Sequence, residues 1–106
     1  YQILSIRRQM SKQINVVGRL TLQEGKMDEV KAILAELAVA TRQEPGNIEY
    51  IVHEDTTTPN TVFSIEKWET EEAEAKHWEM EHLKTAFGKL SGFLEAEPLL
   101  NKGYEV

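Results

Sequence analysis

The 106-residue chain contains no cysteine. Disulfide bonds, thiolate metal sites and a cysteine nucleophile are therefore excluded, and any chemistry must come from histidine, carboxylates, tryptophan, tyrosine or bound ligands. Apolar runs are short as well, far below the roughly 20 residues that cross a bilayer. We therefore expect a cytoplasmic protein with no membrane partner.

Positive charge is also scarce. The chain has 12 lysines and arginines against 18 aspartates and glutamates, which gives a net charge of −6. A nucleic-acid-binding domain needs the opposite balance, so nucleic acids and anionic membranes are excluded as partners. Motifs built on glycine are missing too: Gly18 and Gly25 stand alone, and no serine lies in a nucleophile elbow.

The first thirteen residues differ from the rest. They begin with the apolar stretch "ILSI", which is followed by the basic pair Arg7 and Arg8. This stretch is too short for a secretory signal, in which the basic residues come first. We expect residues 1–13 to be an N-terminal extension or a cloning remnant, with Met10 as a natural start, and residues 14–106 to form the domain.

The domain alternates between strand and helix patterns. Residues 14–22 alternate apolar and polar side chains as a strand does, and residues 27–42 place apolar side chains at helical spacing. The sequence "EPGN" at residues 44–47 ends this helix, because proline and glycine do not continue it. Residues 48–54 and 61–68 predict two strands, joined into an antiparallel hairpin by the turn "DTTTPN".

A second helix follows this hairpin. Thr70 is placed to cap it, and helical character continues to about Leu90 with a break near Glu79. Residues 99–106 predict a short last strand. The order strand, helix, strand, strand, helix, strand predicts an α+β ferredoxin-like βαββαβ fold, in which two helices cover one face of a four-stranded antiparallel sheet.

The strands carry apolar residues on both of their faces. Neighbouring pairs such as Val16 and Val17, or Tyr50 and Ile51, send apolar side chains to opposite sides of the sheet. A sheet that helices cover on one side only is expected to be polar on the other. We therefore predict a homodimer that packs sheet face to sheet face as a dimeric α+β barrel.

The segment "EKWETEEAEAKHWEMEH", residues 66–82, holds both tryptophans, two of the three histidines and seven glutamates. Trp68, at the end of its strand, is either a core anchor or a cavity wall that stacks on a flat aromatic ligand. His77 is either a solvated helix residue or a proton shuttle, since histidine titrates near neutral pH.

Metal binding is the weaker interpretation of this segment. His82 follows His77 by five residues, a spacing that does not bring two histidines of one helix to the same ion. Glu74, His77 and Glu81 do stack along one helix face, but such faces are common in acidic helices. We therefore expect no metal site, and we expect His53, which precedes two acidic residues, to be a solvated strand end.

The segments "VVGRL", "EPGNIEY" and "EKWETEEAEAKHWEMEHLKTAF" together resemble the antibiotic biosynthesis monooxygenase (ABM) family over about residues 14–106. The specific combination is the strand-ending Trp68 with acids on both sides and histidines nine and fourteen residues beyond it. The resemblance implies a dimeric ferredoxin-like fold with a cavity between helices and sheet. It also implies, for the oxygenase members, a phenolic substrate that is deprotonated and then reduces O2 directly, without flavin, haem or metal.

Three positions depart from particular branches of that family. Ser64 stands where the anthrone oxygenases have asparagine, and Glu74 stands where they have tyrosine. Gly18 stands where the haem-degrading members have asparagine on the first strand. The paired histidines look more like those of the quinol oxygenases, and also like those of members that isomerise a small phosphorylated signal, although the domain has few arginines to anchor a phosphate.

The leading hypothesis is a cofactor-independent monooxygenase that oxidises a quinol-like or polyphenolic aromatic with O2. The alternatives are a non-catalytic small-molecule-binding or stress-response module, and an ABM-type isomerase or haem-handling protein. In the leading hypothesis, His77 is the general base and Trp68 the stacking wall. The expected substrate contacts are Ser64, His82, Tyr50 and Phe63.

Overall fold

Four strands and three α-helices follow one another in the computed structural model, which describes residues 12–106. In chain order the elements are β1 (Ile14–Thr21), α2 (Met27–Arg42), β2 (Asn47–Glu54), β3 (Thr61–Trp68), α3 (Glu71–His77), α4 (Glu81–Leu90), the 3-10 helix η1 (Ser91–Phe93) and β4 (Leu99–Gly103). Residues 1–11, most of the predicted N-terminal extension, lie outside the described residues. Within residues 12–106, no helix has the length and apolar character needed to cross a membrane.

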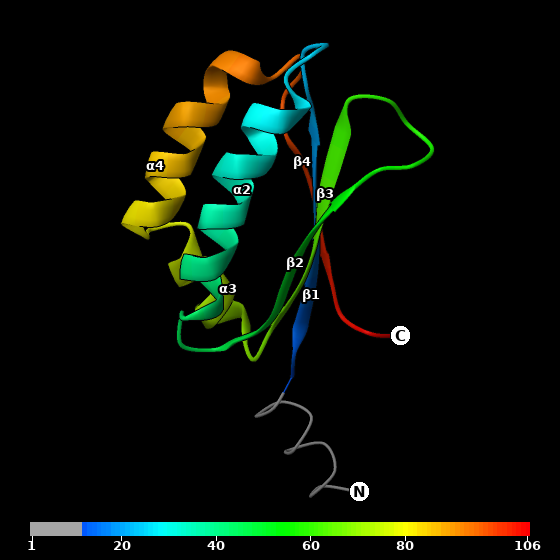
Figure 1. Ribbon diagram of the computed structural model, residues 1–106. Helices are drawn as coiled ribbons and strands as arrows, with labels where there is room; N and C mark the ends of the chain where they lie inside the picture. The colour runs from blue at the N-terminus through cyan, green and yellow to red at the C-terminus, as the bar shows by residue number, and fades with distance from the viewer. Residues whose placement is uncertain (1–11) are drawn as a thin grey trace, which may run out of the picture.

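The strands form one antiparallel sheet in the order β2-β3-β1-β4. The helices α2 and α4 lie side by side on one face of this sheet, and no described element covers the other face (Figure 1). This is the ferredoxin-like α+β arrangement, so the fold expected from the order of elements is confirmed. The central strands β1 and β3 run through the middle of the sheet and carry most of the buried positions.

The core lies between the sheet and the two long helices. Its largest cluster combines Leu20, Leu22 and Val62 of the sheet side with Leu34 of α2 and Leu90 of α4. Full burial of such side chains stabilises the fold by about 1.5–3 kcal/mol each. A second, smaller cluster at the start of β1 consists of Ile14, Val16 and Trp68, with Ala73 of α3 packed against it.

The turn after α2 is fixed by a glycine. Gly46 has a φ of 86°, in the left-handed region that other residues rarely adopt. A Cβ atom at this position would lie 2.5 Å from the Cβ of Ala73, so the turn and α3 approach each other closely only because residue 46 has no side chain. The carbonyl of Gly46 also accepts a hydrogen bond from the amide of Glu69 at 2.8 Å. The turn is therefore held against the start of α3.

The predicted break in the second helical segment is present. The Thr70 hydroxyl caps α3 by accepting a hydrogen bond from the Ala73 amide at 3.1 Å. The helix α3 ends at His77, and Met80 has an extended backbone before α4 begins. Because the chain changes direction between the two helices, the side chains of His77 and His82 no longer follow one helical phase.

Candidate functional site

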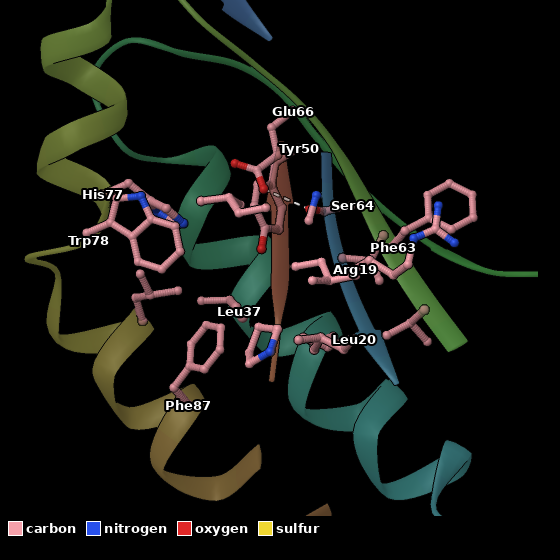
Figure 2. A pocket seen from close by; sticks show the side chains of 18 residues that line it. Arg19, Leu20, Leu37, Tyr50, Phe63, Ser64, Glu66, His77, Trp78 and Phe87 are labelled. Carbon is pink, nitrogen blue, oxygen red and sulfur yellow. Dashed lines mark hydrogen bonds between the residues drawn. The ribbon is translucent and has the colours of Figure 1, made fainter. Parts of the chain in front are cut away.

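A cavity with about 570 Å³ of empty space, its open mouth included, lies between the inner face of the sheet and the helices. Its walls are mainly apolar, with contributions from all four strands and from α2 and α4. A few polar side chains point into it, among them Ser64, Glu66 and His77 (Figure 2). An apolar cavity with a small number of converging polar groups is the usual form of a small-molecule site.

Gly18 leaves the floor of this cavity open. It lies on β1 opposite Ser64 of β3 and Leu100 of β4. A Cβ atom on residue 18 would be 2.9 Å from the Ser64 Oγ and 3.6 Å from a methyl group of Leu100. The Gly18 amide donates a hydrogen bond to the Ser64 Oγ at 3.2 Å, which fixes the hydroxyl at the cavity wall.

A buried carboxylate joins the two histidines of the α3–α4 region. Glu44, in the turn after α2, places its Oε2 atom 2.7 Å from the Nδ1 atom of His77 and 2.7 Å from the Nε2 atom of His82. The side chains of Glu44 and His77 are 4% and 3% exposed, whereas that of His82 is 28% exposed. Because Nδ1 of His77 is engaged with Glu44, Nε2 is the nitrogen left to face a ligand.

A second buried carboxylate, Glu66, lies on the sheet side of the cavity. One of its oxygens accepts a hydrogen bond from the Ser64 hydroxyl at 2.7 Å, and the other accepts one from the Trp68 indole N–H at 3.0 Å. Burial raises the pKa of the Glu66 carboxyl above its ordinary value, although these two hydrogen bonds and the nearby His77 act in the opposite direction. Glu66 is therefore a second buried titratable group at the cavity wall.

The raised pKa of Glu66 makes stability depend on pH. A carboxyl whose pKa is higher in the folded chain binds its proton more tightly there, so the free energy of unfolding falls as pH rises from about 4.3 through the folded value. Glu66→Gln removes the ionisation and keeps one oxygen to accept from the Trp68 N–H, while its amide N–H is able to donate to the Ser64 Oγ. We expect the variant to gain stability relative to the natural chain between about pH 4 and pH 7 in urea denaturation.

The matched control for this measurement is Glu72→Gln, which removes one carboxylate from an exposed position of α3. We expect the stability difference between this control and the natural chain to change less with pH than that of Glu66→Gln. If the stability gained by Glu66→Gln relative to the natural chain stays constant or shrinks as pH rises, the raised pKa of Glu66 is contradicted.

Tyr50 completes the polar part of the wall from β2. Its ring is 5.8 Å from the His77 ring, and the residue is 5% exposed. Burial, and after it the neighbouring Glu66 and Glu44, raise the pKa of the Tyr50 hydroxyl above its ordinary value. The hydroxyl therefore stays protonated at neutral pH and is able to donate a hydrogen bond.

The structure places Trp68 differently from the predicted stacking wall. Its side chain is completely buried in the cluster with Ile14 and Val16, and it is not among the residues that line the cavity. It contacts two residues of the site: its ring centroid lies 4.9 Å from that of His77, and its N–H donates a hydrogen bond to Glu66. Of the two interpretations offered by the sequence, the core anchor describes this position.

Trp78, the residue after α3, provides the aromatic wall instead. It lies beside the cavity near Phe87 of α4, with ring centroids 6.3 Å apart (Figure 2). Its N–H donates to the buried Glu74 at 2.7 Å, and Lys102 of β4 donates to the other oxygen of that carboxylate at 2.9 Å. These contacts fix the indole plane while 40% of the residue remains exposed.

The other predicted substrate contacts divide into two groups. Ser64 and Tyr50 do line the cavity. Phe63 borders it from β3, but its ring stacks on His53 with centroids 5.0 Å apart and lies away from the cavity (Figure 2). His82 does not line this cavity and contacts Glu44 from the outer side. His53, expected to be a solvated strand end, is half-buried against Phe63.

Three residues of the site were not found from the sequence: Glu44, Glu66 and Trp78. Glu66 had a detectable signal, because it precedes Trp68 by two residues and therefore lies on the same face of the strand. Trp78 directly follows His77, but a single helical phase across the segment would have pointed the two side chains apart. Glu44 had no local signal, since its role depends on contacts with residues more than 30 positions away.

The sequence model of the antibiotic biosynthesis monooxygenase family matches residues 13–89, which is most of the chain. The chain belongs to the ABM family. No match was found among curated protein sequences.

Solved structures share the fold of this chain. A conserved protein from Methanosarcina mazei Go1 is 26% identical, with a TM-score of 0.85 over 92% of this chain and 97% of that one. A Pseudomonas aeruginosa protein is 22% identical, with a TM-score of 0.83 over the same shares. A candidate antibiotic biosynthesis monooxygenase from Caulobacter crescentus CB15 is 20% identical, with a TM-score of 0.85 over 96% of this chain and 98% of that one. At these identities the last two show the shared ABM fold alone.

Proposed function

We propose that this ABM domain is a cofactor-independent monooxygenase that oxidises a quinol-like or polyphenolic aromatic with O2. The observation that carries the proposal is His77 at the wall of an apolar cavity, with its Nδ1 atom hydrogen-bonded to the buried Glu44. Glu44 sets the tautomer of His77 and would stabilise the imidazolium that forms when Nε2 accepts a proton. Family membership supports the reaction class.

The proposed reaction begins when a phenolic O–H of the substrate gives its proton to Nε2 of His77. The resulting anion is a good electron donor, and the apolar cavity strengthens its reaction with O2 by excluding water. One oxygen atom of O2 bonds to a ring carbon to form a peroxide. The O–O bond then breaks: this atom stays on the ring, and the other leaves as water with the proton held by His77 and the hydrogen of that ring carbon. A quinol and O2 thus yield a hydroxyquinone and one water molecule.

The remaining polar groups would orient the substrate. The Tyr50 hydroxyl, kept protonated by burial, is placed to donate to a substrate oxygen that carries developing negative charge. Ser64 lies on the same sheet face as Tyr50, where its hydroxyl accepts from the Gly18 amide and donates to Glu66, and one lone pair is left to accept from a substrate O–H. Trp78 offers the aromatic surface on which a flat ring would stack.

Two copies are proposed to pack through the open faces of their sheets. Val17 of β1, Ile65 of β3 and Ile51 of β2 lie directly opposite one another in register and form an apolar row across that face. In the single chain, Ile51 is 39% and Ile65 is 36% exposed. A contiguous apolar sheet face of this kind is stabilised by burial against an identical face.

The proposed function is tested by oxygen uptake of the metal-stripped protein with a panel of reduced naphthoquinols and polyphenols. We expect uptake above autoxidation, and we expect His77→Ala to lower it by about 10²–10⁴-fold, the usual contribution of a general base. His53→Ala is the matched control, because it removes a histidine on the other side of the sheet. If His77→Ala takes up oxygen as fast as the natural chain, His77 is not the general base.

A panel without any uptake would favour the non-catalytic binding module. In that case, tight binding of the same aromatics without turnover would identify the cavity as a receptor site. A haem titration with a Soret shift would instead favour the haem-handling alternative.

A further inference from the structure

We propose that Glu44, His77 and His82 form a binding site for a divalent transition-metal ion of the zinc class, and that metal occupancy excludes proton abstraction by His77. The first part rests on the geometry of the three side chains alone. The second part rests on the proposed function, since it concerns the same His77.

The three side chains converge from three segments that are separate in the sequence. Glu44 comes from the turn after α2, His77 from the end of α3 and His82 from the start of α4. One donor atom of each residue lies within 4.8 Å of the other two. Two imidazoles and one carboxylate form a donor set that suits zinc and its transition-metal neighbours, and not magnesium or calcium.

The spacing of the donors is close to that of a bound site. Metal–ligand bonds of about 2.0–2.1 Å place neighbouring donors of a tetrahedral site roughly 3.3 Å apart. Oε2 of Glu44 is 2.7 Å from each of the two histidine nitrogens, so the oxygen needs to separate from each nitrogen by roughly half an ångström. The two histidine nitrogens lie within 4.8 Å of each other. His82 is the residue able to move, because its side chain is 28% exposed and follows the helix break.

A second observation that points to a bound cation is the incomplete pairing of the Glu44 carboxylate. Its side chain is 4% exposed, yet its Oε1 atom has no hydrogen-bond partner. Its ion-pair partners within residues 12–106 are the two histidines, and no lysine or arginine of these residues forms an ion pair with it. A buried carboxylate that is partly unpaired is unfavourable, and a dication at this point would neutralise it and engage the free oxygen.

An ion has a route to the site that does not pass through the cavity. His82 lines a hollow on the outer side, between α2 and α4, with Glu36, Glu81 and Lys89 also at its wall. The two carboxylates outnumber the one ammonium group, and this balance favours the approach of a cation. Three protein donors leave one position of a tetrahedral ion for water.

Metal binding would change the protonation pattern of His77. Without metal, Nδ1 of His77 and Nε2 of His82 carry the protons that are donated to Glu44. A metal ion needs the lone pairs of those two nitrogens, so the remaining proton of each neutral imidazole moves to the other nitrogen. Nε2 of His77 then carries a hydrogen, and it is unable to accept a proton from a ligand in the cavity.

The binding experiment uses the whole chain after treatment with EDTA. Calorimetric titration with ZnCl2 is expected to give one ion per chain for the natural protein and for His53→Ala, and no saturable heat with MgCl2. Glu44→Gln and His82→Ala are each expected to weaken zinc binding at least about tenfold. His82→Ala keeps the test decisive if the buried Glu44→Gln fails to fold, because position 82 is partly exposed.

The outcomes separate the two parts of the proposal. No zinc binding to the natural chain, or equal binding by His82→Ala, would overturn the metal site whatever the enzyme activity. With a substrate that supports oxygen uptake, zinc is expected to suppress the uptake, and EDTA is expected to restore it. The same zinc concentration is expected to leave the rate of His82→Ala equal to the rate of that variant without metal. Binding without suppression would overturn the exclusion and retain the site. Absence of uptake in the metal-free protein would overturn the proposed function while the calorimetric result stands.

Discussion

Trp68→Ala is expected to lower the free energy of unfolding by about 3–5 kcal/mol, the range of such substitutions in protein cores. The indole is completely buried with Ile14 and Val16, so its removal leaves a cavity that these strand residues are unable to close. The loss also leaves one oxygen of the buried Glu66 without its donor. Urea denaturation followed by far-UV circular dichroism measures the effect.

Two further variants separate packing from hydrogen bonding. Trp68→Phe keeps an aromatic ring and removes the N–H. Its free energy of unfolding is expected to fall by about 1.5–3 kcal/mol, because Glu66 loses the hydrogen bond from the indole. Trp78→Ala removes a tryptophan that is 40% exposed and is expected to lose less than Trp68→Ala. The core-anchor assignment fails if the two alanine variants are equally stable.

Ile65→Lys is expected to convert the proposed dimer into a monomer. Ile65 lies at the centre of the open sheet face, directly opposite both Val17 and Ile51. In a face-to-face dimer, two lysines would be buried near the two-fold axis, where desolvation and mutual repulsion exceed what the remaining apolar contact supplies. Sedimentation equilibrium at micromolar concentrations measures the change in mass.

The control for this prediction is Val39→Lys. Val39 lies on α2, on the helical side of the molecule, and is 63% exposed, so the same charge is added away from the sheet face. We expect this variant to keep the mass of the natural chain. A natural chain that is already monomeric at these concentrations would overturn the dimer.

The fold was accessible from the sequence because local signals and the overall topology agree. The "EPGN" turn, the Thr70 cap and the break near Glu79 are all present close to their predicted positions. The last strand is shorter than predicted and ends at Gly103, because Gly103 pairs with Asn15 and its partner strand β1 begins only one residue earlier, at Ile14.

The site was less accessible, because its contacts join distant parts of the chain. In one continuous helix, residues 77 and 82 would point in different directions. The extended backbone at Met80 separates α3 from α4, so both histidines are able to reach Glu44. The two interpretations of Trp68, core anchor and cavity wall, are separated by how the end of β3 packs against Ile14, Val16 and Ala73, which residue type does not determine.

The missing side chain at Gly18 has a consequence for how ligand size is set in this fold. A Cβ atom at position 18 would lie 2.9 Å from the Ser64 Oγ and 3.6 Å from a methyl group of Leu100, so a single added methyl group would already press on the serine hydroxyl. Residue 18 therefore limits how closely a ring in the cavity can approach the sheet. In this chain, a larger residue at position 18 is expected to hold a ligand ring nearer the mouth of the cavity.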